Sequence, residues 1–368
     1  MGLFFQGRTE YKAQSLQAMA WRKFRKNKQG LFLLCFLGFV SLIALLGYLI
    51  TPDSTPYANE QILEIQLQKP FSKVTFLEIQ KNQDIKKRNF IHKMLYGQPN
   101  LYTVVPISKY WIARDSIHVE LFNESPPYNR ASYGLTGTKI AQKTYYLGTD
   151  RYGRDVLSQL IIGARVSLSV GFVSVFIALI IGVFLGATAG YFRGKIDDAI
   201  MWFINVVWSI PTLLLVIAIS FALGAGFWQI FIAIGLTMWV DIARVVRGQT
   251  ISLREKEFVE ASKALGFKSL TIIFKHILPN MTGTIIVVAA ANFASAILTE
   301  ASLSFLGIGV QPPMPSWGTM IKENYGYIIL DYAYLAIIPG VAIMLLVLCF
   351  MLLGNVIRDI LDVKEGKE

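Results

Sequence analysis

The sequence predicts an all-α polytopic membrane protein with six transmembrane helices and an extracytoplasmic α+β insertion between the first two. The chain has 368 residues, of which 54% are hydrophobic and 16% are charged, and its mean hydropathy is +0.49. It is therefore more apolar and less charged than an average soluble domain. Several apolar runs reach the length of about 20 residues that a helix needs to cross the bilayer core. A long polar stretch separates the first run from the second.

Six apolar segments are the predicted spans: 31–50, 166–189, 199–222, 228–246, 283–306 and 335–356. We expect the first, within residues 30–50, to be a retained anchor. Its basic lead-in would also suit a cleaved signal peptide, but the apolar run exceeds the roughly 7–15 residues typical of one, and no small-residue cleavage site follows. Pro211 interrupts the third span and predicts a kink there, because proline removes a hydrogen bond of the helix.

The placement of Lys and Arg predicts the orientation of the chain. If the N-terminus is cytoplasmic, four segments lie on that side: 1–29, 190–198, 244–282 and 357–368. They hold 19 of the 35 basic residues, whereas the two short loops on the other side hold only Lys322. This bias is the positive-inside rule, so we expect a basic cytoplasmic N-terminal segment and a cytoplasmic tail at 358–368. Topology thus explains much of the net charge of +11 without a nucleic-acid partner.

Residues 51–145 form the predicted extracytoplasmic inserted domain. Loops longer than roughly 12–15 residues usually carry structure or a function of their own. The stretches SKVTFLEI and DSIHVELF show the alternation that is typical of strands. Two interpretations remain open: a docking surface for an external partner, and a decoration that packs over the spans. The segment LGTDRYGRDV that follows predicts a structured lead-in to the second span, with turn-forming glycines and four charges: Asp150, Arg151, Arg154 and Asp155.

Glycine and polar residues within the spans predict how the helices pack and what they enclose. Gly182, Gly186 and Gly190 recur every four residues, so they lie on one helical face where another backbone can approach closely. The possible substrate path consists of polar residues in the third and fifth spans: Asn205, Ser209, Asn292, Ser295, Thr299 and Glu300. A carboxylate at membrane depth is a functional candidate by default. Glu300 lies near the outer end of its span, so a structural anchor paired with water or an arginine is the other interpretation.

The sequence offers no set of residues for chemistry of its own. Cys35 and Cys349 lie inside apolar segments, which indicates neither a disulfide framework nor a metal cluster. There is no GxxxxGK[ST] phosphate loop and no HExxH pair. We therefore expect a subunit that is not an enzyme and that holds no metal and no cofactor. The alternatives are a polytopic membrane enzyme, which needs a nucleophile and base within the spans, and an ion-coupled secondary transporter, which needs ionisable residues near the midplane and inverted repeats.

The charged stretch between the fourth and fifth spans, EFVEASKALGFKSLTIIFKHILPN, predicts a helix-turn-helix element. Ser252 and Glu255 fit a capping box, so we expect its first helix to start directly after Ser252. Gly266 suits a left-handed helix end, Ser269 can cap a second short helix, and Pro279 prevents a smooth continuation into the fifth span. The element would lie along the inner face of the membrane. An amphipathic interfacial linker is the simpler interpretation, which periodicity alone leaves open.

The same stretch resembles the coupling-helix signature of permease subunits of type I ABC importers. The matching residues are Glu260, Ala261, Ser262, Gly266, Leu278 and Pro279. Ser262 stands in place of a second alanine, and His276 in place of the isoleucine of the broad signature, although HILPN is similar to the peptide-importer variant. Four blocks in the expected order resemble the second permease subunit of dipeptide and oligopeptide importers: LGTDRYGRDVLSQLIIGARVSL, RVVRGQTISLREKEFVEASKALG, KHILPN and TEASLSFLGIGVQPPMPSWGTMI.

This resemblance implies the type I ABC importer architecture, with a permease core of five spans at 146–357 and a cytoplasmic coupling helix at 253–279. It implies a bacterial plasma (inner) membrane, a second permease subunit, two ATPase subunits that bind ATP and magnesium, and an extracytoplasmic peptide-binding protein. The residues expected at the ATPase contact are Glu260, Ala261, Ser262, Gly266, His276, Leu278 and Pro279. Closure of the ATPases would push the coupling helix and switch the pathway between inward-open and outward-open states, carrying dipeptides or oligopeptides.

Overall fold

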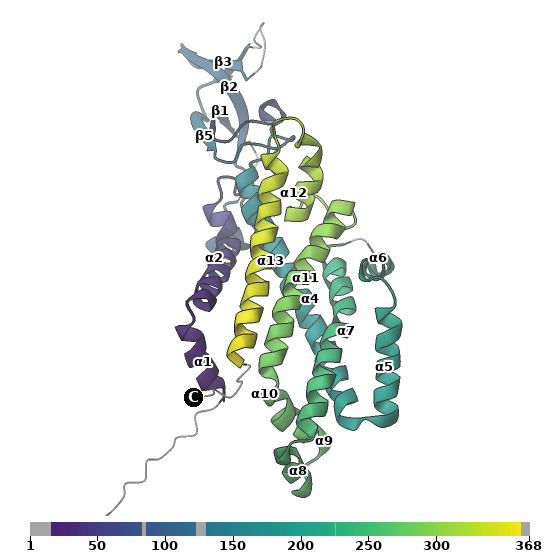
Figure 1. Ribbon diagram of the computed structural model, residues 1–368. Coiled ribbons are helices and arrows are strands. Elements are labelled where there is room, and N and C mark those ends of the chain that lie inside the picture. The colour runs from purple at the N-terminus through teal and green to yellow at the C-terminus, as the bar shows by residue number, and fades with distance from the viewer. Residues whose placement is uncertain (1–15, 83–85, 123–129, 225, 362–368) are drawn as a thin grey trace, which may run out of the picture.

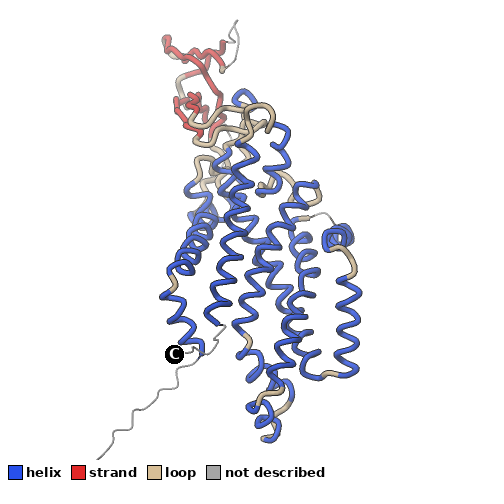
Figure 2. The backbone as a smooth tube through the Cα atoms, in the orientation of Figure 1, coloured by secondary structure: helices blue, strands red, loops and turns tan. Residues whose placement is uncertain are grey.

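The computed structural model describes residues 16–82, 86–122, 130–224 and 226–361. A bundle of long helices carries a small antiparallel sheet at one end (Figure 1). Figure 2 shows the strands gathered in this cap, with helices making up the rest of the long body. The outermost parts of the two predicted cytoplasmic ends, residues 1–15 and 362–368, lie outside the described residues.

Five helices of the described chain are long and apolar enough to cross a membrane. They are α2 (Lys28–Ile50), α4 (Val156–Phe192), α7 (Phe227–Arg254), α11 (Thr282–Leu306) and α13 (Tyr334–Leu361). They match five of the six predicted spans. The helices extend beyond the predicted spans, most of all α4, which begins at Val156, α7, which continues to Arg254, and α13, which continues to Leu361. The 37 residues of α4 extend over about 55 Å, which exceeds the hydrocarbon core of about 30 Å.

The predicted third span consists of two helices. α5 (Gly194–Trp208) and α6 (Thr212–Leu223) are bent by 92° at a short break that contains Pro211. Proline has no backbone N–H to donate and disfavours the helical conformation of the residue before it. The predicted break at Pro211 is confirmed, but the bend is sharper than a kink in a continuous helix. A sixth span exists only if this bent pair is counted as one.

Helices α4 and α7 pack along the glycine face that the sequence predicts. A Cβ atom on Gly182 would lie 2.7 Å from the carbonyl oxygen of Trp239, and one on Gly190 would lie 2.7 Å from that of Arg247. A larger residue at either position would force the two backbones apart. The predicted close contact is therefore confirmed, and it lies within the larger hydrophobic core of the bundle.

The inserted domain is a five-stranded antiparallel sheet with one short helix. Its strands are β1 (Ser72–Gln80), β2 (Tyr102–Ala113), β3 (Ser116–Leu121), β4 (Arg130–Gly134) and β5 (Thr138–Tyr145), in the spatial order β4-β3-β2-β1-β5. The strands predicted from SKVTFLEI and DSIHVELF are confirmed as β1 and β3. Apolar residues on the two sides of the sheet form separate small cores, around Phe76 and around Leu77. The short helix α3 (Phe90–Tyr96) follows β1 in the chain.

The other short helices lie near the two ends of the bundle. They are α1 (Leu16–Lys26), α8 (Glu257–Ala264), α9 (Ser269–Ile272), α10 (Leu278–Asn280) and α12 (Trp317–Asn324). Figure 1 places α12 close to the sheet, whereas α1, α8 and α9 lie at the opposite end. The inserted domain and the charged stretch between α7 and α11 are thus separated by the length of the spans.

Candidate functional site

The segment between α7 and α11 forms a helical hairpin at the end of the molecule opposite the sheet (Figure 1). It comprises α8, α9, a π-helical turn (Ile273–Ile277) and α10. We call residues 257–280 the hairpin. Its helices α8 and α9 project beyond the ends of the neighbouring long helices, so a partner on this side of the membrane would reach them first.

The hairpin starts later than the sequence predicts. Helix α7 continues without a break through Arg254, so Ser252 and Glu255 form no capping box, and that prediction is wrong. The physical reason is that the buried face of α7 continues through Thr250, which packs against α4 and keeps the helix intact. Helix α8 begins after Lys256, whose side chain makes no capping hydrogen bond.

The turn between α8 and α9 is a Schellman motif built on Gly266. This glycine has a φ of +77°, the left-handed conformation that the sequence predicts. Its N–H donates to the carbonyl oxygen of Lys263 (2.9 Å), and the N–H of Phe267 donates to that of Ser262 (3.2 Å). A Cβ atom on Gly266 would meet nothing within 4 Å. The glycine is therefore required by the backbone conformation, and the space outside it is open.

The seven predicted contact residues divide into an outer and an inner group. The exposed ones are Glu260, Ala261, Gly266 and Pro279. Ser262 is buried, and its hydroxyl donates to the carbonyl oxygen of Phe258 (2.7 Å). His276 and Leu278 are half-buried, and the His276 ring lies 5.8 Å from the ring of Phe267. Ser262 and His276 thus shape the hairpin, while the exposed group forms its surface.

Apolar side chains of the hairpin surface were not predicted from the sequence. Leu265, Phe267, Leu270 and Phe274 are all exposed. The signal that could have found them is the density of large apolar residues in LGFKSLTIIF, which exceeds what two very short helices can bury. Val259, six residues before Leu265, is fully buried, so the apolar residues of the hairpin point both inward and outward.

The second half of the hairpin connects it to the core. Helix α9 begins at Ser269 after its N-cap Lys268, so Ser269 does not cap it as predicted. Pro279 lies in α10, and the helical conformation is interrupted at Met281 before α11 begins. This confirms the predicted interruption. Ile277 and Met281 are buried in the main hydrophobic core. The hairpin is therefore anchored in the bundle at its base and free at its tip.

Two ion pairs near the hairpin join the last part of α7 and the residue after it to the start of α5 and the residue before it. Arg247 on α7 pairs with Asp197 on α5 through two contacts, Nε to Oδ1 (2.5 Å) and Nη2 to Oδ2 (2.7 Å). Arg193, between α4 and α5, pairs with Glu255 through Nη2 and Oε1 (2.6 Å). Glu255 stands two residues before α8, so a displacement of the hairpin would act directly on the pair between Arg193 and Glu255.

The predicted path residues on α5 lie beside an arginine. Nη2 of Arg244 on α7 donates to Oδ1 of Asn205 (2.8 Å), and its guanidinium lies 3.9 Å from the centre of the Trp208 ring. The hydroxyl of Ser209 donates back to the carbonyl oxygen of Val206 (2.7 Å). Asn205 and Ser209 are both exposed. Arg244 was not among the residues predicted from the sequence, and it adds a positive charge to this face.

Three of the four predicted polar residues on α11 share one side of the helix. Asn292, Ser295 and Thr299 follow one another at spacings of three and four residues. Ser295 is exposed, and its carbonyl oxygen accepts a hydrogen bond from the hydroxyl of Thr299 (2.8 Å). Within the described parts of the chain, this group makes no hydrogen bond with Asn205 or Ser209. The two groups of predicted path residues are thus not brought together by this chain alone.

Glu300 is fully buried and lies on a different side of α11 from the exposed Ser295. It follows Ser295 by five residues, which turns it by roughly 140° around the helix. Its Oε1 accepts a hydrogen bond from the Ser304 hydroxyl (2.6 Å), whose oxygen in turn accepts from the Val310 N–H (3.1 Å) and the Ser316 hydroxyl (3.4 Å). The partner is thus a serine, where the sequence suggested water or an arginine. These bonds tie α11 to the loop that leads into α12.

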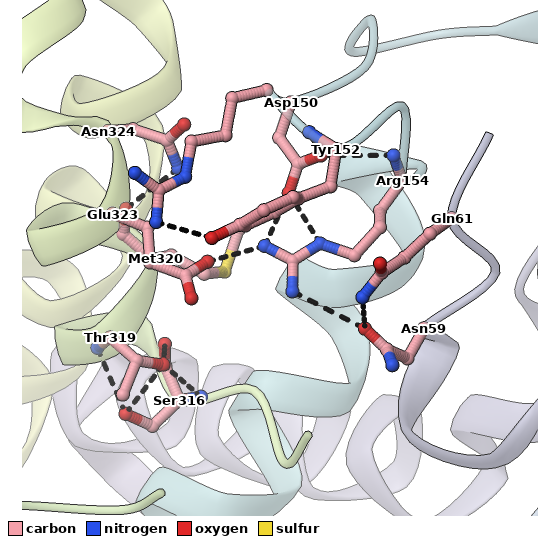
Figure 3. Close-up of polar contacts among 11 residues, drawn as sticks. Asn59, Gln61, Asp150, Tyr152, Arg154, Ser316, Thr319, Met320, Glu323 and Asn324 are labelled. Atoms are coloured by element: carbon pink, nitrogen blue, oxygen red, sulfur yellow. Dashed lines mark hydrogen bonds and ion pairs between the residues drawn. The ribbon is translucent and has the colours of Figure 1, made fainter. Parts of the chain in front are cut away.

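A second polar cluster joins the inserted domain, the lead-in to α4 and helix α12 (Figure 3). The Nε of Arg154 donates to Oδ2 of Asp150 (2.6 Å), and its Nη1 donates to Oδ1 of Asn59 (3.4 Å). The same guanidinium pairs with Glu323 of α12. Burial lowers the pKa of Arg154, but Asp150 and Glu323 outweigh it and hold the pKa above its ordinary value. Asp155 caps α4 by accepting from the Ser158 N–H (2.9 Å).

Two models of known protein families match parts of this chain. Residues 15–70 match the model of the N-terminal TM domain of oligopeptide transport permease C. Residues 182–364 match the model of the binding-protein-dependent transport system inner membrane component. Most of the inserted domain lies between the two matches.

Three curated relatives extend the match over most of their length. The oligopeptide transport system permease protein OppC of Bacillus subtilis is 36% identical over 66% of this chain and 81% of its own. The glutathione transport system permease protein GsiD of Pectobacterium atrosepticum is 40% identical over 60% and 73%. The dipeptide transport system permease protein DppC of Alkalihalophilus pseudofirmus is 44% identical over 60% and 72%. These relatives are transport subunits and not enzymes. The chain belongs to the family of binding-protein-dependent transport system inner membrane components, as a multi-pass permease subunit of an ABC importer.

Proposed function

We propose that this chain and a second permease subunit together enclose a pathway for dipeptides or oligopeptides across a bacterial plasma membrane. Two cytoplasmic ATPase subunits, which bind ATP and magnesium, would drive the cycle. The chain would contribute one half of the pathway, in the core at 146–357, and one mechanical contact with an ATPase. The relatives belong to dipeptide, oligopeptide and glutathione transport systems, which supports the substrate class.

The exposed surface of the hairpin is the observation that carries this proposal. Leu265, Leu270 and Phe274 are exposed on the hairpin, and so is the carboxylate of Glu260 on α8. Exposed apolar anchors with charged neighbours are typical of protein interfaces, because burying them on a partner releases water from apolar surface. A cleft on the ATPase would cover these side chains, with the small Ala261 and Gly266 allowing close approach.

Contacts at the base of the hairpin support its role as a lever. A push on α8 would act on Glu255 and so on Arg193, at the turn between α4 and α5. Helices α4 and α7 are packed backbone to backbone at Gly182 and Gly190, so they would move as one body. In this way closure of the ATPases would reach the α5 face that carries Asn205.

The polar residues on α5 and α11 fit a peptide as substrate. Arg244 can pair with a carboxylate, and Asn205 can exchange hydrogen bonds with a peptide group. The exposed Ser295 and the half-buried Thr299 add polar groups on α11. Because the two groups do not meet within this chain, the second permease would complete the pathway. Glu300 would act by holding the loop before α12 in place.

Three observations support an orientation with the hairpin in the cytoplasm. The hairpin lies at the opposite end of the bundle from the inserted domain, and the described C-terminal end and α1 lie at the hairpin end (Figure 1). Apart from the long segment 52–165, the basic residues of the connecting segments are concentrated at that same end. Residues 51–145 would then be extracytoplasmic, where they would contribute a docking surface for a peptide-binding protein.

Purification of the tagged chain from native membranes in mild detergent tests the assembly. We expect mass spectrometry to identify a second permease and one or two Walker-type ATPases in the complex. Recovery of the chain alone, also after cross-linking, would contradict the proposal. Peptide uptake into proteoliposomes of the purified complex then separates the energy sources: it should require ATP on the hairpin side, and uptake driven only by an ion gradient would favour a secondary transporter.

A further inference from the structure

Helix α3 of the inserted domain carries exposed apolar side chains. Phe90, Ile91 and Leu95 are exposed, and they fall within an arc of roughly 140° at 100° per residue. A seven-residue helix with this composition gains nothing from such exposure in water. An apolar surrounding would stabilise the helix, and the described residues of this chain do not supply one.

The position of α3 along the bundle is fixed by Arg165. Its Nε and Nη2 donate to the carbonyl oxygens of Ala44 (2.9 Å) and Leu45 (2.7 Å) on α2, and its Nη1 and Nη2 donate to those of Leu95 (2.8 Å) and Met94 (2.9 Å) on α3. Ala44 stands six residues before the end of α2, or about 9 Å along the helix. Along the direction of α2, the last turn of α3 thus lies beside residues within the apolar span and not beyond its end.

The same level follows from α4. Arg165 directly precedes the apolar run that starts at Val166, so the guanidinium lies where the span enters the bilayer. Helix α2, to which Arg165 ties α3, also has exposed apolar side chains, among them Phe39, Leu42 and Leu45. Both α3 and the neighbouring part of α2 thus expose apolar side chains near the level of Arg165.

The carbonyl groups at the end of α3 have hydrogen-bond partners within the protein and do not need water. The last carbonyl groups of a helix have no partner within the helix, and at a protein surface water usually satisfies them. Arg165 satisfies Met94 and Leu95, while Nη1 of Arg88 donates to the carbonyl oxygens of Tyr96 (2.9 Å) and Gly97 (2.9 Å). Two arginines thus satisfy four successive carbonyl groups. Complete internal satisfaction of this kind is what a lipid environment demands.

We propose that α3 is an interfacial anchor, embedded in the membrane leaflet on the side of the inserted domain. Phe90, Ile91 and Leu95 enter the acyl chains, and the exposed Lys86 and Lys87 just before the helix reach the lipid phosphates. The sheet would then be held at two places, by its covalent connections to α2 and α4 and by this contact with lipid. Its position relative to the pathway entrance would be fixed even without a bound partner.

The test uses two matched positions in the assembled complex. Ile91 of α3 and Ile112 of β2 are the same residue type and are similarly exposed, at 63% and 60%. After replacement of Cys35 and Cys349 by alanine, Ile91→Cys and Ile112→Cys each carry one nitroxide label. The complex is placed in nanodiscs of phosphatidylcholine and phosphatidylglycerol. Collision with oxygen, which concentrates in lipid, is compared with collision with a water-soluble nickel complex by electron paramagnetic resonance.

We expect oxygen collisions to exceed nickel collisions at position 91, and the reverse at position 112. A label at Lys87→Cys should give a ratio between the two. Nickel collisions in excess at position 91 would place α3 in water and overturn the proposal. Low collision rates for both reagents at position 91 would also overturn it, because they would show that a protein partner covers α3. If the Ile91 variant fails to assemble, Phe90→Cys gives the same readout from the same face.

Discussion

Arg247 and Asp197 form an ion pair with two contacts, in which Nε lies 2.5 Å from Oδ1 and Nη2 lies 2.7 Å from Oδ2. The carbonyl oxygen of the same arginine packs against Gly190, where a Cβ atom would lie 2.7 Å away. One residue of α7 thus holds both the first turn of α5 and the end of α4. Because the hairpin begins ten residues later in the chain, this junction is where its movement would enter the spans.

Breaking this ion pair should lower the stability of the protein and weaken the transmission of hairpin movement to the spans. In a double-mutant cycle with Arg247→Ala and Asp197→Ala, we expect a coupling energy of about 1 kcal/mol, because the pair is only partly exposed to solvent. Arg247→Lys should retain part of it, since lysine keeps the charge and loses the two-point geometry. Thermal unfolding of the purified complex measures the energy, and strictly additive single effects would show that the pair does not interact.

The packing of α4 on α7 should tolerate no added methyl group. Gly182→Ala would place a Cβ 2.7 Å from a backbone oxygen, and overpacking of this kind costs about 1–3 kcal/mol. The matched control is Gly38→Ala on α2, where a Cβ would meet nothing within 4 Å and helix propensity improves. Thermal unfolding should show a lower Tm for the first variant and an equal or higher Tm for the second. Equal behaviour of the two would contradict the close contact.

Removing only the arginine from the cluster around Arg154 should lower the stability more than removing the arginine and both carboxylates. Arg154→Met would leave the carboxylates of Asp150 and Glu323 close together and unpaired in a largely buried site. Loss of one partner from a buried ion pair costs about 3–5 kcal/mol. Adding Asp150→Asn and Glu323→Gln removes the unpaired charges, so the triple variant should regain most of the lost stability. Limited proteolysis of the inserted domain gives a local readout, and a triple variant no better than the single one would contradict the electrostatic explanation.

Some features of the fold could be predicted from the sequence, because each depends on a pattern of residues that are close together in the chain. Hydrophobic runs predict the five spans. The four-residue spacing of glycines predicts the close face of α4. Alternation of apolar and polar residues predicts strands β1 and β3. The left-handed turn at Gly266 follows from the chemistry of glycine. The bend of 92° between α5 and α6 could not be predicted in size, since Pro211 marks a break but tertiary packing sets the angle.

Features that depend on tertiary contacts were missed or misplaced. The capping box at Ser252 has the right residue types, yet packing of α7 on α4 keeps the helix intact beyond it. Glu300 is paired with Ser304, because the loop before α12 folds over it. Arg165 resembles any basic residue at the edge of a span, and its four backbone contacts join segments that are distant in the sequence. No local pattern contains that information.

The contact at the turn of the hairpin should be sensitive to charge at Gly266. Gly266→Asp and Gly266→Asn add side chains of nearly the same shape at a position with open space around it, and asparagine tolerates the left-handed conformation best among non-glycine residues. An unpaired carboxylate in an interface costs well over the ~1.4 kcal/mol that corresponds to a tenfold weaker contact. We expect the aspartate variant to remain in the membrane and to lose uptake and ATPase association by more than about tenfold, with asparagine much closer to the parent.

Equal uptake by the aspartate and asparagine variants would show that charge at Gly266 is irrelevant to coupling. Loss of both proteins from the membrane would instead indicate a folding defect at the Schellman turn. In that case Ala261→Asp, on the exposed side of α8, with Ala261→Asn as its control, repeats the comparison within a helix.

Site-specific photo-cross-linking in native membranes tests most directly whether the hairpin is held by an ATPase. Leu270 of the hairpin and Leu63 of the inserted domain are both leucines with 61% exposure, and each is replaced by a photoreactive phenylalanine analogue. We predict that position 270 cross-links to a Walker-type ATPase and that position 63 does not. Cross-linking of position 270 to lipid alone, in membranes that contain the assembled complex, would make the hairpin an interfacial linker and would contradict its role in coupling.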